Sequence, residues 1–146
     1  MVDIKNFGQT IMEYDLGKYE FDFGFSFPRE YKEFLKSVNG GIPTPNKFDL
    51  SKKEKEGLVL NVLFGVGVEK NYNVFYILKR LKNSLSRSWI PIGEVEGGGL
   101  VCLGVEGDKF ENIYFWDKKE GERAEDGKNF FLVAENFEGF LNSIYE

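Results

Sequence analysis

The chain has 146 residues, a net charge of −5, and a composition that is 42% hydrophobic and 16% aromatic. This length and apolar content indicate one domain with its own core and exclude a disordered chain. With no histidine and a single cysteine, Cys102, the chain lacks Ser-His and Cys-His nucleophile pairs, most zinc sites and an internal disulfide. Residues 1–10 show no signal-peptide pattern, and no apolar run has membrane-spanning length. We therefore expect a cytoplasmic protein that does not enter a membrane.

Charge is distributed unevenly along the chain. Residues 1–30 carry a net charge of −3, residues 31–90 a net charge of +6, and residues 91–146 a net charge of −8. An acidic C-terminal third disfavours direct binding to nucleic acid and favours a basic protein partner. Solubility alone is also a sufficient reason for a net charge of this size, so both interpretations stay open.

The N-terminal half of the chain predicts one strand and two helices. Alternating aromatic residues over 21–27 are typical of a strand with one buried face. Pro28 fits the first position of an amphipathic helix over 28–38, which the glycines after Asn39 end. A second apolar stripe predicts a helix over 72–84, with its basic side chains largely on the solvent side.

The second half of the chain predicts an antiparallel meander of strands. A polar loop over 118–127 precedes the last strand, and Asn136 caps a C-terminal helix that ends near residue 145. Helices near both ends and in the middle of a meander indicate the fold class α+β, as a single domain over 1–146 with a twisted antiparallel sheet flanked by helices. The predicted strands span residues 47–50, 58–66, 89–93, 100–105, 112–117 and 130–134.

The residues offer little catalytic chemistry. The glycines around Gly65 lack the third glycine of a dinucleotide fingerprint, and those at 97–99 are not followed by the Lys-Ser or Lys-Thr of a phosphate loop. Glu94 and Glu96 lie beside turn glycines, where we expect solvation rather than acid–base catalysis or metal binding. Cys102 alternates with apolar neighbours and is expected to be a small buried hydrophobe.

Several short motifs occur in the order of a known family. The motifs are Pro28 with Tyr31 and Phe34-Leu35, Asn39-Gly40-Gly41, Phe64-Gly65, Pro91-Ile92-Gly93, Gly98-Gly99-Leu100, Trp116-Asp117 and Val133 to Phe137. With them, over residues 27–145, the chain resembles the SUKH superfamily, which includes bacterial immunity proteins of polymorphic toxin systems and a fungal cell-wall-synthesis regulator. The family usually opens with an amphipathic helix, whereas residues 1–26 of this chain predict strand and turn.

The resemblance implies a non-enzymatic binding protein with no cofactor and no metal. It favours an immunity protein that binds and neutralises a cognate toxin domain, often a nuclease. The alternative is a regulatory scaffold that binds a cellular protein. A small hydrolase is a third class, which the absence of histidine disfavours. The motif residues with a structural role are Pro28, Asn39, Gly40, Gly41, Gly65, Gly93 and Trp116.

Carboxylates in the polar loops of the last third are the predicted contacts to a basic toxin. Hairpin turns at one end of a sheet would bring some of them together, and charges on such a rim raise the rate of association. One or two exposed aromatic side chains would then supply specificity. The candidate residues are Glu94, Glu96, Asp108, Asp117, Glu120 and Glu122.

Overall fold

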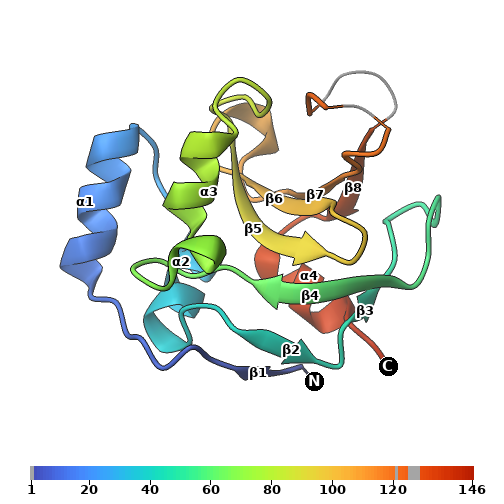
Figure 1. The fold of residues 1–146 in the computed structure, drawn as a ribbon, viewed down its shortest axis with the longest axis horizontal. Helices are drawn as coiled ribbons and strands as arrows, with labels where there is room; N and C mark the ends of the chain where they lie inside the picture. The colour runs from blue at the N-terminus through green and yellow to red at the C-terminus, as the bar shows by residue number, and fades with distance from the viewer. Residues whose placement is uncertain (1, 121, 125–128) are drawn as a thin grey trace.

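The computed structural model describes residues 2–120, 122–124 and 129–146 (Figure 1). The predicted loop 118–127 therefore lies partly outside the described residues, at 121 and 125–127. The helices are α1 (Glu13–Phe23), α2 (Arg29–Ser37), α3 (Val74–Arg80) and α4 (Phe137–Ser143), with 3₁₀ turns η1 (Lys70–Tyr72) and η2 (Gly107–Lys109). The strands are β1 (Asp3–Lys5), β2 (Ile42–Thr44), β3 (Lys47–Phe48), β4 (Leu58–Leu63), β5 (Trp89–Val95), β6 (Leu100–Gly104), β7 (Ile113–Trp116) and β8 (Phe130–Ala134).

Six of these strands form one antiparallel sheet in the order β3-β4-β5-β6-β7-β8, and β1 pairs with β2 in a separate ribbon. The sheet is the predicted meander, because strands that follow one another in the chain are neighbours in space. Its β5–β6 register shifts between Pro91, which has no N–H to donate, and Gly93. A Cβ on Gly93 would lie 3.0 Å from the Val62 carbonyl oxygen, so a larger residue would require the neighbouring strand β4 to shift by a few tenths of an ångström. The fold class α+β is confirmed.

The strand predicted over 21–27 is wrong. The first half of that segment is the last turn of α1, and Gly24 ends this helix in the left-handed conformation (φ 74°), with its N–H donating to the Glu20 carbonyl. The aromatic residues of this segment therefore belong partly to the last turn of α1 and partly to the extended chain after it. They do not lie along one strand. Phe21 is 87% exposed and lies outside the core. With α1 present, the chain has the opening helix that the resemblance leads one to expect.

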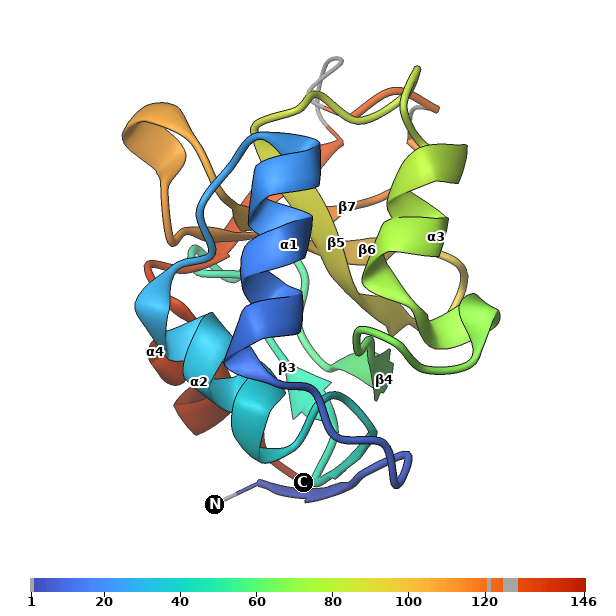
Figure 2. The ribbon, with the colours of Figure 1, turned by 90° about the vertical axis from the view of Figure 1, so that its left-hand side faces the viewer.

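Aromatic rings join α1 to α3. The Phe75 ring of α3 lies 4.3 Å from the ring of Tyr19 and 4.6 Å from that of Phe23, measured between centroids. Phe25 and Phe27, which follow α1, place their ring centroids 6.0 and 6.1 Å from the same ring. Figure 2 shows α1 and α3 on the same side of the strands. Aromatic pairs at these separations add to the apolar area that they bury, so this cluster holds both helices on the sheet.

The other three helices occupy the predicted segments, with shifted ends. Pro28 is the residue before α2 and not its first residue, and its carbonyl accepts from the Lys32 N–H at 3.0 Å. Helix α3 is shorter than predicted and ends at Arg80. It starts after Asn73, whose side chain caps it by accepting from the backbone N–H groups of Phe75 and Tyr76. Asn136 caps α4 as predicted, accepting from the Gly139 N–H at 2.7 Å.

A buried asparagine joins the end of α2 to the end of β4. The Asn39 side chain accepts from the Val66 N–H and donates to the Val66 carbonyl, each at 2.8 Å. The two backbones approach so closely that a Cβ on Gly65 would lie 2.3 Å from the Asn39 carbonyl oxygen. A Cβ on Gly40 would lie 2.8 Å from the Leu63 carbonyl oxygen, at a φ of 84°. The Asn-Gly-Gly motif is therefore a tertiary contact as well as a helix end.

A second polar network surrounds Asp49, in the connection between β3 and β4. Its carboxylate accepts from the Gly57 N–H at 2.8 Å, the Tyr145 hydroxyl at 2.7 Å and the Lys53 ammonium at 2.9 Å. These donors, Tyr145 foremost, lower the pKa of Asp49 to about 2. The hydrogen bond to Asp49 in turn raises the pKa of the Tyr145 hydroxyl.

Replacing Asn39 by alanine is expected to lower the free energy of unfolding by about 3 kcal/mol. The change leaves the Val66 N–H and carbonyl buried without partners, and each such group costs about 1–3 kcal/mol. Urea unfolding followed by circular dichroism measures the effect. The matched control is Asn61→Ala, an exposed asparagine of β4, which should change the value by less than about 0.5 kcal/mol. Similar losses in both variants would contradict the assignment.

The Asp49 network predicts a pH dependence of stability. Because the folded pKa lies below the ordinary value near 4, the stabilisation is complete above about pH 4 and is lost as the pH falls through about 2. Asp49→Asn should therefore show a flatter decline in the free energy of unfolding between pH 4 and pH 2 than the wild type. Urea titrations across this range test it, with Asp108→Asn, an exposed carboxylate, as control. Equal slopes in wild type and Asp49→Asn would refute the prediction.

Candidate partner-binding site

Strand register brings several predicted carboxylates to one end of the sheet. Leu100 of β6 pairs with Glu94 of β5 on one side and with Trp116 of β7 on the other. The β5–β6 turn and the segment after β7 therefore lie at the same end. The side chain of Lys119 reaches this turn, since its Nζ would lie 3.4 Å from a Cβ on Gly97.

Four of the predicted carboxylates form the exposed group that we call the acidic rim. All four side chains are exposed, and the two from the segment after β7 follow Asp117 closely. The Glu120 N–H donates to the Asp117 carbonyl at 3.0 Å, which keeps this segment at the same end as the β5–β6 turn. The acidic rim consists of Glu94, Glu96, Glu120 and Glu122.

Asp117 does not present an exposed carboxylate. Its side chain belongs to a residue only 7% exposed and forms an ion pair with Lys55, 62 positions earlier in the chain. The same carboxylate accepts from the Lys119 N–H at 3.1 Å. Asp117 therefore fixes the segment that carries Glu120, and its contribution to the rim is positional.

Asp108 lies at the opposite end of the sheet from the acidic rim. It belongs to η2, which connects the end of β6 to the start of β7, whereas the rim lies where β6 starts and β7 ends. Successive turns of an antiparallel meander alternate between the two ends. The sequence predicted the positions of these turns along the chain correctly. Asp108 and Glu94 nevertheless do not share one rim, because the pairing of the strands places them at opposite ends of the sheet.

The rim also borders positive charge. A groove of about 470 Å³ runs between α3 and the rim, and Glu94, Arg80 and Lys118 all line it. The Lys118 ammonium lies 5.5 Å from the centroid of the Trp116 ring, and Trp116 itself is fully buried. The basic helix and the acidic turns, separate in sequence, are thus neighbours here.

Two further surfaces were missed by the sequence analysis. Tyr14 and Phe21, 74% and 87% exposed, lie on α1, on the other side of the molecule from the β5–β6 turn (Figure 1). The helical spacing of the buried or half-buried Leu16, Tyr19 and Phe23 was the available signal for this outward face. Between α2 and α4, a groove of about 510 Å³ has Phe34, Val38, Phe137 and Leu141 among its apolar lining residues and Glu30, Glu33 and Glu138 among its charged ones.

The described residues contain no cluster of three or more metal-binding side chains and no helix long and apolar enough to cross a membrane. Cys102 is 0% exposed, as predicted.

Burial raises the pKa of the Tyr31 hydroxyl, which has no hydrogen-bond partner among the described residues. A deeply buried phenol of this kind is part of the core, since nothing polar from solvent reaches it.

Comparison with known proteins identifies the family. The model of the SMI1 / KNR4 family (SUKH-1) matches residues 11–143. The chain belongs to this family. It is also 26% identical over 147 residues to the "SPbeta prophage-derived uncharacterized protein YokK" of Bacillus subtilis (strain 168), covering 90% of this chain and 73% of that protein. The SUKH-1 match includes α1, which the sequence analysis had interpreted as strand and turn.

A substitution at Tyr31 tests whether its buried hydroxyl makes a hydrogen bond or whether only its ring contributes to stability. Tyr31→Phe keeps the ring in the core and removes a buried hydroxyl without a partner, so the free energy of unfolding should rise by about 1 kcal/mol. Tyr145→Phe is the matched control and should lower it, because the Tyr145 hydroxyl donates to Asp49 at 2.7 Å. Chemical denaturation of both variants measures the difference. A Tyr31→Phe protein less stable than the wild type would show that the hydroxyl has a partner.

Proposed function

We propose that this chain is a cytoplasmic immunity protein that binds and neutralises a cognate toxin domain without catalysing a reaction. The observation that carries the proposal is membership of the SUKH-1 family over residues 11–143, because the superfamily includes immunity proteins of polymorphic toxin systems. The name of the Bacillus subtilis relative describes it as prophage-derived, which is compatible with a role in conflict between cells.

The acidic rim is the proposed contact with the toxin. Its four exposed carboxylates lie on the β5–β6 turn and the segment that Asp117 fixes. A nuclease toxin needs a basic surface to bind phosphates, and a carboxylate rim complements that surface and speeds the encounter. In this arrangement the chain meets the toxin and not the nucleic acid.

The test uses the polypeptide encoded directly upstream of this gene as the candidate toxin. The rim variant Glu94→Lys, Glu96→Lys, Glu120→Lys should associate with it at least about tenfold more slowly at low salt, with a weaker salt dependence, because steering between opposite charges is lost. Stopped-flow or surface-based kinetics measure the rate. Asp117 is left intact because its ion pair with Lys55 supports the fold.

The matched control variant reverses the charge of three exposed glutamates at the opposite end of the sheet and should associate nearly as fast as the wild type. These residues are Glu106, Glu111 and Glu135. A wild-type rate for the rim variant, together with loss of binding in the α1 variant Tyr14→Ala, Phe21→Ala, would place the contact on α1. A chain that neither binds the polypeptide nor protects cells producing it would overturn the immunity function and favour a regulatory scaffold.

A further inference from the structure

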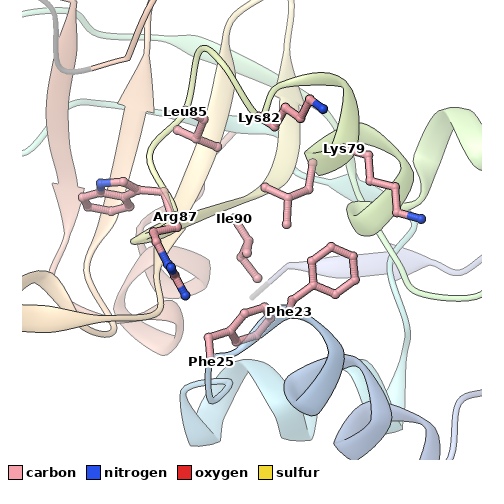
Figure 3. Close-up of a pocket in the computed structure, with 9 residues that line it drawn as sticks. Phe23, Phe25, Lys79, Lys82, Leu85, Arg87 and Ile90 are labelled. Carbon is pink, nitrogen blue, oxygen red and sulfur yellow. The ribbon is translucent and has the colours of Figure 1, made fainter.

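A groove with apolar walls opens between the end of α1, helix α3 and the start of β5 (Figure 3). Its volume is about 430 Å³, within the range of pockets that hold small organic ligands. Figure 3 shows Phe23 and Phe25 on one side, Leu85 opposite them and Ile90 between. The apolar residues that line the groove are Phe23, Phe25, Leu78, Leu85, Trp89 and Ile90.

The charged residues that line this groove are all cations. They are Lys79, Lys82 and Arg87, each exposed, and no carboxylate is among the described lining residues. None of the ion pairs between described residues involves any of the three. The Arg87 guanidinium lies beside the end of α1, with one nitrogen 3.5 Å from where a Cβ on Gly24 would lie. Positive charge thus borders an apolar floor from two sides.

We propose that this groove binds a small organic anion with an apolar body and one carboxylate, sulfonate or phosphate group. Packing the body against Phe23, Phe25 and Leu78, which are half-buried, removes exposed apolar surface from water. Leu85, Trp89 and Ile90 are already buried and form the floor of the groove. The anionic group then lies at the margin beside one of the ammonium or guanidinium groups, which are donors without competing acidic partners in the described part of the chain. This site is independent of the acidic rim and of the toxin-binding proposal.

An extended protein segment is the less favoured occupant because of its backbone. Each backbone N–H that a bound segment buries needs an acceptor. The lining side chains are aromatic, aliphatic or cationic, and none of them offers a hydrogen-bond acceptor. A small anion without N–H groups has no such requirement, so the lining suits it better.

Two fluorescent probes that differ by one group test the proposal. They are 8-anilinonaphthalene-1-sulfonate and its uncharged analogue N-phenyl-1-naphthylamine. The wild-type chain should bind one sulfonate probe per molecule. It should bind this probe about tenfold more tightly than the uncharged one, because the three exposed cations attract the sulfonate group. A tenfold ratio of dissociation constants corresponds to about 1.4 kcal/mol of binding free energy. Fluorescence titration gives the two dissociation constants, and calorimetry gives the stoichiometry.

Substitutions then test whether the three cations cause the preference for the sulfonate probe over the uncharged one. The variant Lys79→Gln, Lys82→Gln, Arg87→Gln should lose the preference for the sulfonate while binding the uncharged probe as the wild type does, which also shows that its groove is intact. The control Lys5→Gln, Lys18→Gln, Lys52→Gln removes the same charge from exposed lysines outside the groove and should keep the preference.

Three outcomes would overturn the proposal. The first is the absence of saturable binding, or equal affinity of the wild type for both probes. The second is an equal loss of preference in the control variant, which would make the effect one of net charge. The third is tighter binding of an acidic peptide with one phenylalanine than of the sulfonate probe, which would make the groove a docking site for a protein segment.

Discussion

The pairing of Asn39 with the backbone of Val66 is the contact on which the rest of the fold depends. Two hydrogen bonds of 2.8 Å attach the end of α2 to the chain leaving β4, and both are buried. The close approach that they require leaves no room for a Cβ on Gly65. One asparagine thereby sets how α2 lies against the sheet and where the segment leading to α3 starts. Replacing Asn39 is costly because it leaves the buried N–H and carbonyl of Val66 without hydrogen-bond partners.

The aromatic cluster around Phe75 has two consequences. Tyr19, Phe23, Phe25 and Phe27 converge on this ring and hold α1 and α3 on one face of the sheet. The cluster does not fill all the space between those helices and β5, so some of the same rings line the apolar groove. Core packing and the proposed anion site therefore share residues, and substitutions of the cations at the margin separate the two roles better than substitutions of the rings.

Charge separation in the sequence becomes a mixture in three dimensions. The acidic last third supplies the rim, but Asp117 is buried against Lys55, and Arg80 and Lys118 line the same groove as Glu94. Asp108 is carried to the other end of the sheet by the alternation of turns. Net charge along a segment therefore indicates the sign of a partner but not the position of the contact, because strand pairing decides which carboxylates share a surface.

The sequence by itself determined the α+β class, the order of the meander, the cap of α4 at Asn136 and the burial of Cys102. These features depend on signals within a few residues: alternation, turn glycines and a capping side chain. Only the tertiary structure decided that Asp117 is buried and that three cations border an apolar groove. The helix over residues 13–23 had a signal in the spacing of its apolar residues, which the aromatic alternation after it obscured. The alternating aromatic residues over 21–27 led to a wrong prediction, because a two-residue period fits a strand even when the segment contains the end of a helix. Asp117 and Lys55 are 62 positions apart, and no local pattern encodes a contact at that distance.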